Sequence, residues 1–191
     1  INEPVGTDGK IKPDAKLLWD GDWADAIYKA GKRQEYGLVF SGGDADNQYY
    51  MSLGFLENDG ILVNSKYKRY TARLDNQRKV LDWLKIGMNL AGSTTNSNEP
   101  IGETGSASLN YQATSIAPVY PIYLREINGN IINDASGNPL FDYGMNGDED
   151  GRAQRPYWAN PGVNFLGSEQ YDKNTLINDQ LSVRTTSEIA F

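Results

Sequence analysis

The sequence contains no cysteine and no histidine, and these two absences exclude several classes of function. Without cysteine the chain has neither a disulfide framework nor a thiol nucleophile. Without histidine it lacks the commonest general base and the commonest metal ligand. Gly-x-Ser-x-Gly, P-loop and dinucleotide-binding fingerprints are missing as well, and carboxylate pairs such as Asp44 and Asp46 lie in polar turns, where they stay ionised. We therefore expect that the protein is not an enzyme.

Long apolar runs and an excess of positive charge are missing too. No run of about 18 apolar residues occurs, so no transmembrane helix is expected, although barrel strands would give a much weaker signal. The net charge of −7 argues against nucleic acid as a partner. The chain begins at Ile1 without an initiator methionine or a signal peptide, which indicates a fragment or a processed chain.

What the sequence does contain is a series of short segments in which large apolar and polar residues alternate. This period-2 pattern is typical of strands whose two faces meet different surroundings. It fits a membrane barrel with lipid outside and a wet lumen inside, and it equally fits half of a soluble sandwich. The apolar members are Tyr49, Met51, Leu53 and Phe55, then Tyr70, Ala72 and Leu74, then Leu84, Ile86, Met88 and Leu90.

Turn residues and composition divide the chain into four regions. Residues 1–34 form a junction with one short helix at 22–32, which Asp22 caps and Gly31 ends. Residues 35–92 contain four strands in antiparallel order, and residues 175–191 return to strand chemistry. Between them, residues 93–174 are expected to form a long loop with a small hairpin around Asn128-Gly129, and no internal repeat of fixed period is evident.

Several strings in this chain resemble the SusC/RagA family of TonB-dependent outer-membrane transporters. They are residues 38–43, 47–55, 59–61, 68–74 and 83–87, with the acidic-Trp segment 22–28 upstream and segments 116–123, 134–139 and 141–144 downstream. The resemblance covers roughly residues 20–190 and places them at the plug–barrel junction and the first barrel strands. It implies an all-β fold: an antiparallel transmembrane β-barrel segment, part of a plugged barrel of about 22 strands, with a long extracellular loop.

The same resemblance implies a location in the outer membrane and import of a glycan or peptide substrate. A SusD-like surface lipoprotein and the TonB complex, reached through a missing N-terminal part, would be the partners, together with outer-membrane lipid. The runner-up interpretation is a soluble secreted β-sandwich that binds carbohydrate or protein. Turn signals stop at Gly92, whereas a sandwich should show them every 8–12 residues, so the barrel is favoured.

Three groups of residues are candidates for binding. Tyr157 and Trp158 beside Arg152 and Arg155 could stack on sugar rings, or could anchor a loop. Charged residues on the polar side of the strands, namely Arg69, Arg73 and Lys85, could line a lumen and contact substrate, or pair with carboxylates.

The third group is a weak calcium candidate. Asn146, Asp148 and Asp150, followed by Gly151, match the first half of an EF-hand loop. The twelfth position is Tyr157 instead of glutamate, so a solvated acidic turn is the alternative. No other cofactor is expected.

Overall fold

The computed structural model describes residues 5–15, 20–100, 108–126, 128–145, 155, 161–171 and 174–190. The chain divides into two compact units. A loop unit comprises residues 1–26 and 104–168, and a sheet unit comprises residues 27–103 and 169–191.

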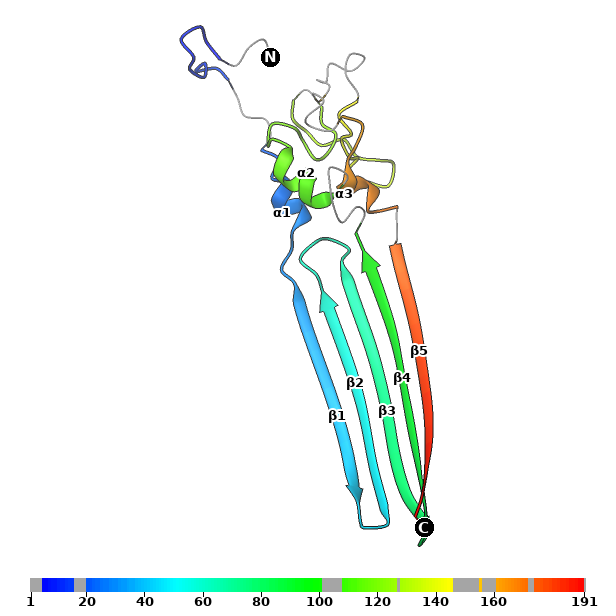
Figure 1. Cartoon of the computed structure of the whole chain (residues 1–191). Helices are drawn as coiled ribbons and strands as arrows, with labels where there is room; N and C mark the ends of the chain where they lie inside the picture. The colour runs from blue at the N-terminus through cyan, green and yellow to red at the C-terminus, as the bar shows by residue number, and fades with distance from the viewer. Residues whose placement is uncertain are drawn as a thin grey trace. The chain divides into compact units, whose positions relative to one another are not determined.

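The sheet unit is built on five antiparallel strands that lie side by side in chain order (Figure 1). Each strand pairs with the next one along the sequence, in the order β1-β2-β3-β4-β5. This arrangement confirms the predicted meander of four strands and the predicted return to strand structure near residue 175. The strands are β1 (Lys32–Gly43), β2 (Asn47–Asp59), β3 (Lys66–Leu81), β4 (Leu84–Glu99) and β5 (Asn174–Ile189).

The register places most of the large apolar residues of the strands on one face. Leu38 lies opposite Leu53, Leu53 opposite Ala72, Ala72 opposite Gly92, and Gly92 opposite Leu181. Because side chains alternate along a strand, the residues between these positions occupy the other face. We call the two surfaces the apolar face and the polar face. Large side chains remain exposed on the apolar face, with Leu38 at 59% and Phe40 at 51%.

β4 is longer than its sequence indicates. The polar stretch from Ser93 to Asn98 was expected to open the long loop, yet the strand continues to Glu99. Its residues have ladder partners on both sides, since Thr94 lies opposite Tyr70 of β3 and Asp179 of β5. Threonine suits strands, and backbone pairing with two neighbours outweighs the loop-like composition.

The predicted helix at 22–32 is present but shorter. It is α1 (Trp23–Ile27), and the carboxylate of Asp22 caps it by accepting a hydrogen bond of 2.8 Å from the backbone N–H of Asp25. The helix ends early because the next residues pair with another segment. Tyr28 forms an antiparallel bridge with Leu62, and the N–H of Lys29 donates to the carbonyl of Ile61.

The loop unit contains two further short helices that the sequence analysis missed, α2 (Leu109–Ser115) and α3 (Phe165–Ser168). Two fully buried amide side chains hold α3 in place. Gln112 accepts a 3.0 Å hydrogen bond from the N–H of Phe165. Asn164 accepts from the N–H of Gly167 and donates to the carbonyls of Ile122 and Asp142. These bonds satisfy backbone groups that a short helix leaves unpaired.

Residues 122–126 and 128–142 form a compact ring instead of an open loop. The N–H of Leu124 donates to the carbonyl of Leu140, that of Leu140 to Ile132, and that of Ile132 back to Leu124, at 2.7–2.9 Å. The predicted hairpin around Asn128-Gly129 is one side of this ring, closed by the Arg125–Ile131 bridge. The three ring residues are spaced by eight along the chain.

Candidate functional site

The polar face carries the three charged residues that the sequence analysis selected for a lumen. Arg69, Arg73 and Lys85 share this face by register, since Arg69 lies opposite Thr95 and Arg73 opposite Ala91. The register therefore agrees with the sequence analysis only on the face that these three residues occupy. Contact with substrate or a lumen stays a prediction for all three.

Arg73 is the centre of a small polar cluster on this face. Its Nε lies 2.6 Å from Oδ2 of Asp75, and its guanidinium carbon lies 5.9 Å from the centroid of the Tyr50 ring. Asn89 donates from its side-chain amide to the other carboxylate oxygen of Asp75. The ion pair therefore lies within β3, and uncharged side chains of β2 and β4 contact it from either side. Tyr50, Asp75 and Asn89 were missed as members of a site, although the alternation places them on the polar face, and the register brings them close to Arg73.

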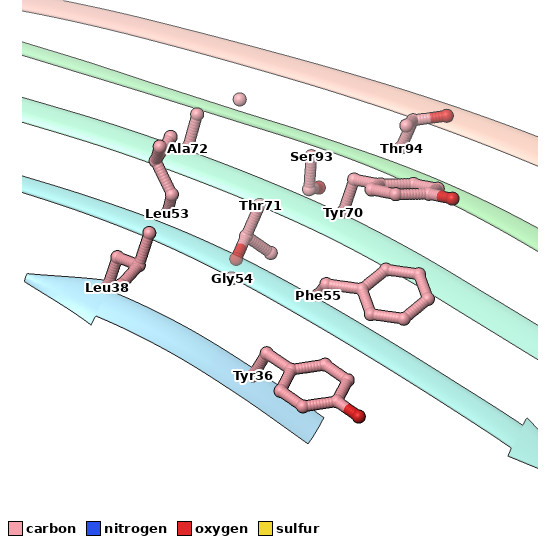
Figure 2. A pocket seen from close by; sticks show the side chains of 11 residues that line it. Tyr36, Leu38, Leu53, Gly54, Phe55, Tyr70, Thr71, Ala72, Ser93 and Thr94 are labelled. Atoms are coloured by element: carbon pink, nitrogen blue, oxygen red, sulfur yellow. The ribbon is translucent and has the colours of Figure 1, made fainter. Parts of the chain in front are cut away.

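The apolar face carries a row of three aromatic rings near the ends of β1, β2 and β3 that lie away from the short turns. Tyr36, Phe55 and Tyr70 are directly opposite one another in the register. Ring centroids are 6.2 Å apart for Tyr36 and Phe55, which are stacked, and 5.0 Å apart for Phe55 and Tyr70. Figure 2 shows the three rings side by side, pointing along the sheet away from the arrowhead of β1. Leu38, Leu53 and Ala72 continue the surface in the other direction.

Charged residues follow this aromatic row immediately on the same face. Lys66 and Lys68 of β3 both reach Oε1 of Glu57 on β2, with N–O distances of 2.9 and 3.1 Å. Lys66 also approaches Asp59 at 3.4 Å. The apolar surface therefore ends abruptly, within one same-face step of the rings.

The apolar band runs obliquely across the sheet. The row that begins with Tyr36 on β1 reaches Thr94 on β4 and Asp179 on β5, both polar. Toward the short turns, the last residue of β1 lies in the same row of the sheet as Gly87 of β4. Leu84 and Ile86 of β4 precede Gly87, so they lie beyond the end of β1. In a membrane barrel, strands are tilted by about 40° and spaced about 4.8 Å apart. A band that runs parallel to the membrane therefore moves along the strand by about 4 Å, or roughly one residue, from each strand to the next. From β3 to β4 the band shifts in the direction that this geometry requires, whereas its edge stays in one row across β1, β2 and β3.

In the loop unit, Arg155 is buried, with only 2% of its surface exposed. Its Nη2 donates to the carbonyls of Asp142 and Val163 at 2.8 and 3.1 Å, and its guanidinium lies 5.8 Å from the ring of Trp23. Burial lowers the pKa of Arg155, and the negative charge of Asp142 opposes that change. These contacts favour the loop-anchor interpretation of Arg155 over contact with a sugar.

The other loop candidates lie outside the described residues. This applies to Arg152, Tyr157 and Trp158, and to the calcium candidates Asn146, Asp148 and Asp150. Among the residues that the structure does describe, no group of three or more carboxylate side chains is placed to hold a metal ion. The sugar-stacking and calcium sites therefore stay predictions.

Within the described ranges, no helix has the length and apolar character needed to cross a membrane. No protein-family model matches the chain. Curated relatives do match it. TonB-dependent receptor P3 of Formosa agariphila is 30% identical over 107 residues, which are 53% of this chain and 11% of the relative. TonB-dependent receptor SusC of Bacteroides thetaiotaomicron is 28% identical over 106 residues, which are 55% of this chain and 10% of the relative.

Solved structures share the fold. The RagAB peptide transporter matches with a TM-score of 0.63 and 22% identity, over 89% of this chain and 17% of that one. The RagAB peptide importer in its open-open state matches with a TM-score of 0.63 and 24% identity, over 90% and 17% respectively. The chain thus spans about a tenth of the length of the curated relatives and about a sixth of the solved chains.

Proposed function

We propose that the strands of this chain form part of an outer-membrane barrel that imports large nutrients. The premise is that the chain is a SusC/RagA-like segment of a TonB-dependent transporter. The observation that carries this proposal is the oblique apolar band on one face of an open five-stranded sheet. A soluble sheet would bury such a face against a second layer. In a bilayer the band faces acyl chains, and its drift reflects the tilt of the strands.

The polar face would then line the wet interior of the barrel. Ionisable side chains within a membrane-spanning segment are costly unless they face water or protein, and they are commonly paired. The Arg73–Asp75 pair with Asn89 satisfies this condition. Arg69 and Lys85 on the same face are proposed as wall residues that contact substrate or the plug.

The lengths of the connections support an orientation for the sheet. The β1–β2 connection comprises residues 44–46 and the β3–β4 connection residues 82–83, whereas β4 and β5 are joined by residues 100–173. Barrels of the outer membrane have short periplasmic turns and longer extracellular loops. We therefore propose that the short turns face the periplasm and that the long β4–β5 connection is extracellular, which keeps the predicted extracellular loop as part of the proposal.

Partners and substrate are proposed from the family resemblance. A SusD-like lipoprotein would cover the outer end of the barrel, and the TonB complex would supply energy through a part of the transporter outside this chain. The substrate would be a glycan or a peptide. RagAB is a peptide transporter, and its similarity to this chain supports the shared fold without distinguishing between the two substrate classes.

The soluble sandwich is the weaker candidate. It requires a second sheet packed on the apolar face, and the described residues form one sheet only. Leu38, Leu53 and Leu181 remain largely exposed on that face.

Transport is tested by deleting the gene of the full-length protein in the organism that makes it. Growth is then compared on defined glycans and on peptide mixtures, with a strain lacking TonB as the matched control. The proposal predicts that one substrate class supports growth only when both the transporter and TonB are present. Unchanged growth on every substrate that requires TonB would contradict it.

A further inference from the structure

We infer that the β2–β3 turn, residues 60–65, is a conformational device that holds together the chain segments leading into the loop unit, and that Asn64 limits how far that unit moves. The inference goes beyond the wall function proposed for the strands. It rests on the proposed function in one respect, namely that the long β4–β5 connection is extracellular. The contacts that carry it all lie within the sheet unit.

The chain passes between the two units three times, after residues 26, 103 and 168. The β2–β3 turn lies at the end of the sheet where these passages begin or finish (Figure 1). The residues on either side of the turn, Asp59 and Lys66, share a row with Asn98 near the end of β4 and Thr175 near the start of β5. The turn is therefore placed to bind the chain on the sheet side of each passage.

The first passage is held by backbone hydrogen bonds. The N–H of Val63 donates to the carbonyl of Ile27 at 3.0 Å, and the N–H of Lys29 donates to the carbonyl of Ile61 at 2.7 Å. Ile27 is the first residue of the sheet unit after this passage, and it is fully buried. Paired backbone groups beside a buried side chain make this the firm attachment.

The other two passages are held by Asn64. Its side-chain amide donates to the carbonyl of Glu169 at 3.1 Å and to Oε2 of the same residue at 3.3 Å. Glu169 is the first residue of the sheet unit after the third passage, and it is buried. The carbonyl of Asn64 accepts a hydrogen bond from the side-chain amide of Asn98, whose Oδ1 accepts from the hydroxyl of Thr175 at 3.3 Å. One residue thus links the end of β4 with the segment that enters β5.

Asn64 is also the attachment that opens most easily. In the part of the chain that the structure describes, it is the one residue other than glycine with a positive φ, at 59°. Such backbone conformations persist only where surrounding contacts hold them, and they collect at switch regions. The side chain of Asn64 is exposed, so water competes for its hydrogen bonds. Release of Asn64 would free two passages and leave the first as a hinge, about which the loop unit moves as one body.

The test measures distances between paired spin labels in the full-length protein in mild detergent. This chain has no cysteine, so introduced cysteines are the only ones once those elsewhere in the protein are replaced. Asn96→Cys on β4 and Ala135→Cys in the loop unit report the distance between the units, and both positions are exposed. Ala45→Cys with Asn96→Cys reports on the sheet unit alone, and Val119→Cys with Ala135→Cys reports on the loop unit alone.

Each pair is measured with native Asn64 and with two substitutions. Asn64→Gly keeps the left-handed backbone and the carbonyl that accepts from Asn98, but it removes the amide that binds Glu169. Asn64→Asp places a carboxylate against the acceptors of Glu169, so repulsion replaces the hydrogen bonds. Asn58→Asp adds the same charge near the same end of β2, on the polar face, and is the matched control.

We expect a narrow distribution of distances between the units with native Asn64 and in Asn58→Asp. Asn64→Gly should widen it about twofold and Asn64→Asp further, while the distances within each unit stay unchanged. An unchanged distribution in Asn64→Asp would overturn the inference, as would one that is already broad with native Asn64. Widening within the loop unit would also overturn it, because the turn would then only stabilise the fold of that unit. Recovery of the native protein as a water-soluble particle would overturn the proposed function instead.

Discussion

The guanidinium of Arg155 lies over the indole ring of Trp23, with 5.8 Å between the guanidinium carbon and the ring centroid. The two residues are distant in sequence, and both are 2% exposed. Trp23 also donates from Nε1 to the carbonyl of Tyr120 at 2.9 Å. One side chain of α1 thus fastens two parts of the long connection, which explains how a segment with loop-like composition holds an ordered structure.

Replacing Trp23 should loosen the loop unit. Trp23→Ala removes a buried ring, its hydrogen bond and its contact with Arg155, and we expect a loss of about 3–5 kcal/mol in local stability. Trp23→Phe keeps a ring and loses the donor, so the loss should be smaller, about 1–3 kcal/mol. Hydrogen exchange of residues 117–124 in the detergent-purified full-length protein measures both. Equal protection in the alanine variant and the wild type would contradict the anchoring role.

Gly144 and Gly137 provide a matched pair in the loop unit. Both have positive φ angles, +66° and +85°. A Cβ at Gly144 would collide with the side chain of Arg155, whereas a Cβ at Gly137 meets nothing within 4 Å. Gly137→Ala should cost about 1–2 kcal/mol from backbone strain alone, and Gly144→Ala should cost about 1–3 kcal/mol more. Protease resistance of the loop unit should therefore fall much further for Gly144→Ala, and the reverse order would be inconsistent with the position of Arg155.

The turn at Asp134 should weaken in acid. Its carboxylate accepts hydrogen bonds from the N–H groups of Asn138 and Ser136, and these bonds hold the pKa of Asp134 below its usual range. A depressed pKa means that the stabilisation is present above the unfolded value of about 3.9 and is lost as the pH falls through the folded value.

Hydrogen exchange of residues 134–138, corrected for the intrinsic rate, tests this pH dependence. Wild type should be better protected than Asp134→Asn at neutral pH, and the difference should vanish in strong acid. A difference that persists unchanged below the folded pKa would show that the carboxylate charge does not hold the turn.

Charge on the two faces of β4 should have opposite consequences. Leu90 lies on the apolar face between Leu74 and Val183, and Ser93 lies on the polar face between Thr71 and Gln180. Leu90→Arg should cost about 2–4 kcal/mol in a bilayer, because the charge faces acyl chains. Ser93→Arg faces the wet interior and should cost much less. Urea unfolding of the refolded full-length protein in vesicles measures both variants, and similar losses would refute the assignment of the faces.

The strands were predictable because their chemistry is local. Alternation along Tyr49–Phe55 and Tyr70–Leu74 fixes which face each side chain occupies, and the short turns fix which strands pair. The length of β4 was not predictable in this way. Residues 93–98 read as a polar loop, and only their partners on β3 and β5 make them a strand.

The loop unit depended on long-range contacts and was therefore harder to predict. Gln112 organises α3, a helix of four residues with no signal of its own. The sequence left Arg155 open between a sugar contact and a loop anchor, because its contact with Trp23 joins residues far apart in the sequence. The ring of Leu124, Ile132 and Leu140 did leave a signal, an eight-residue spacing, which is too short to suggest a familiar repeat.

The most direct test of the central claim is to fractionate membranes of the organism that makes this protein and to size the extracted material in mild detergent. An outer-membrane barrel predicts recovery in the outer-membrane fraction, in a particle far larger than the 21.2 kDa of this chain and accompanied by a lipoprotein. Recovery as a water-soluble particle near 21.2 kDa would contradict the account and return the soluble sandwich as the working structure.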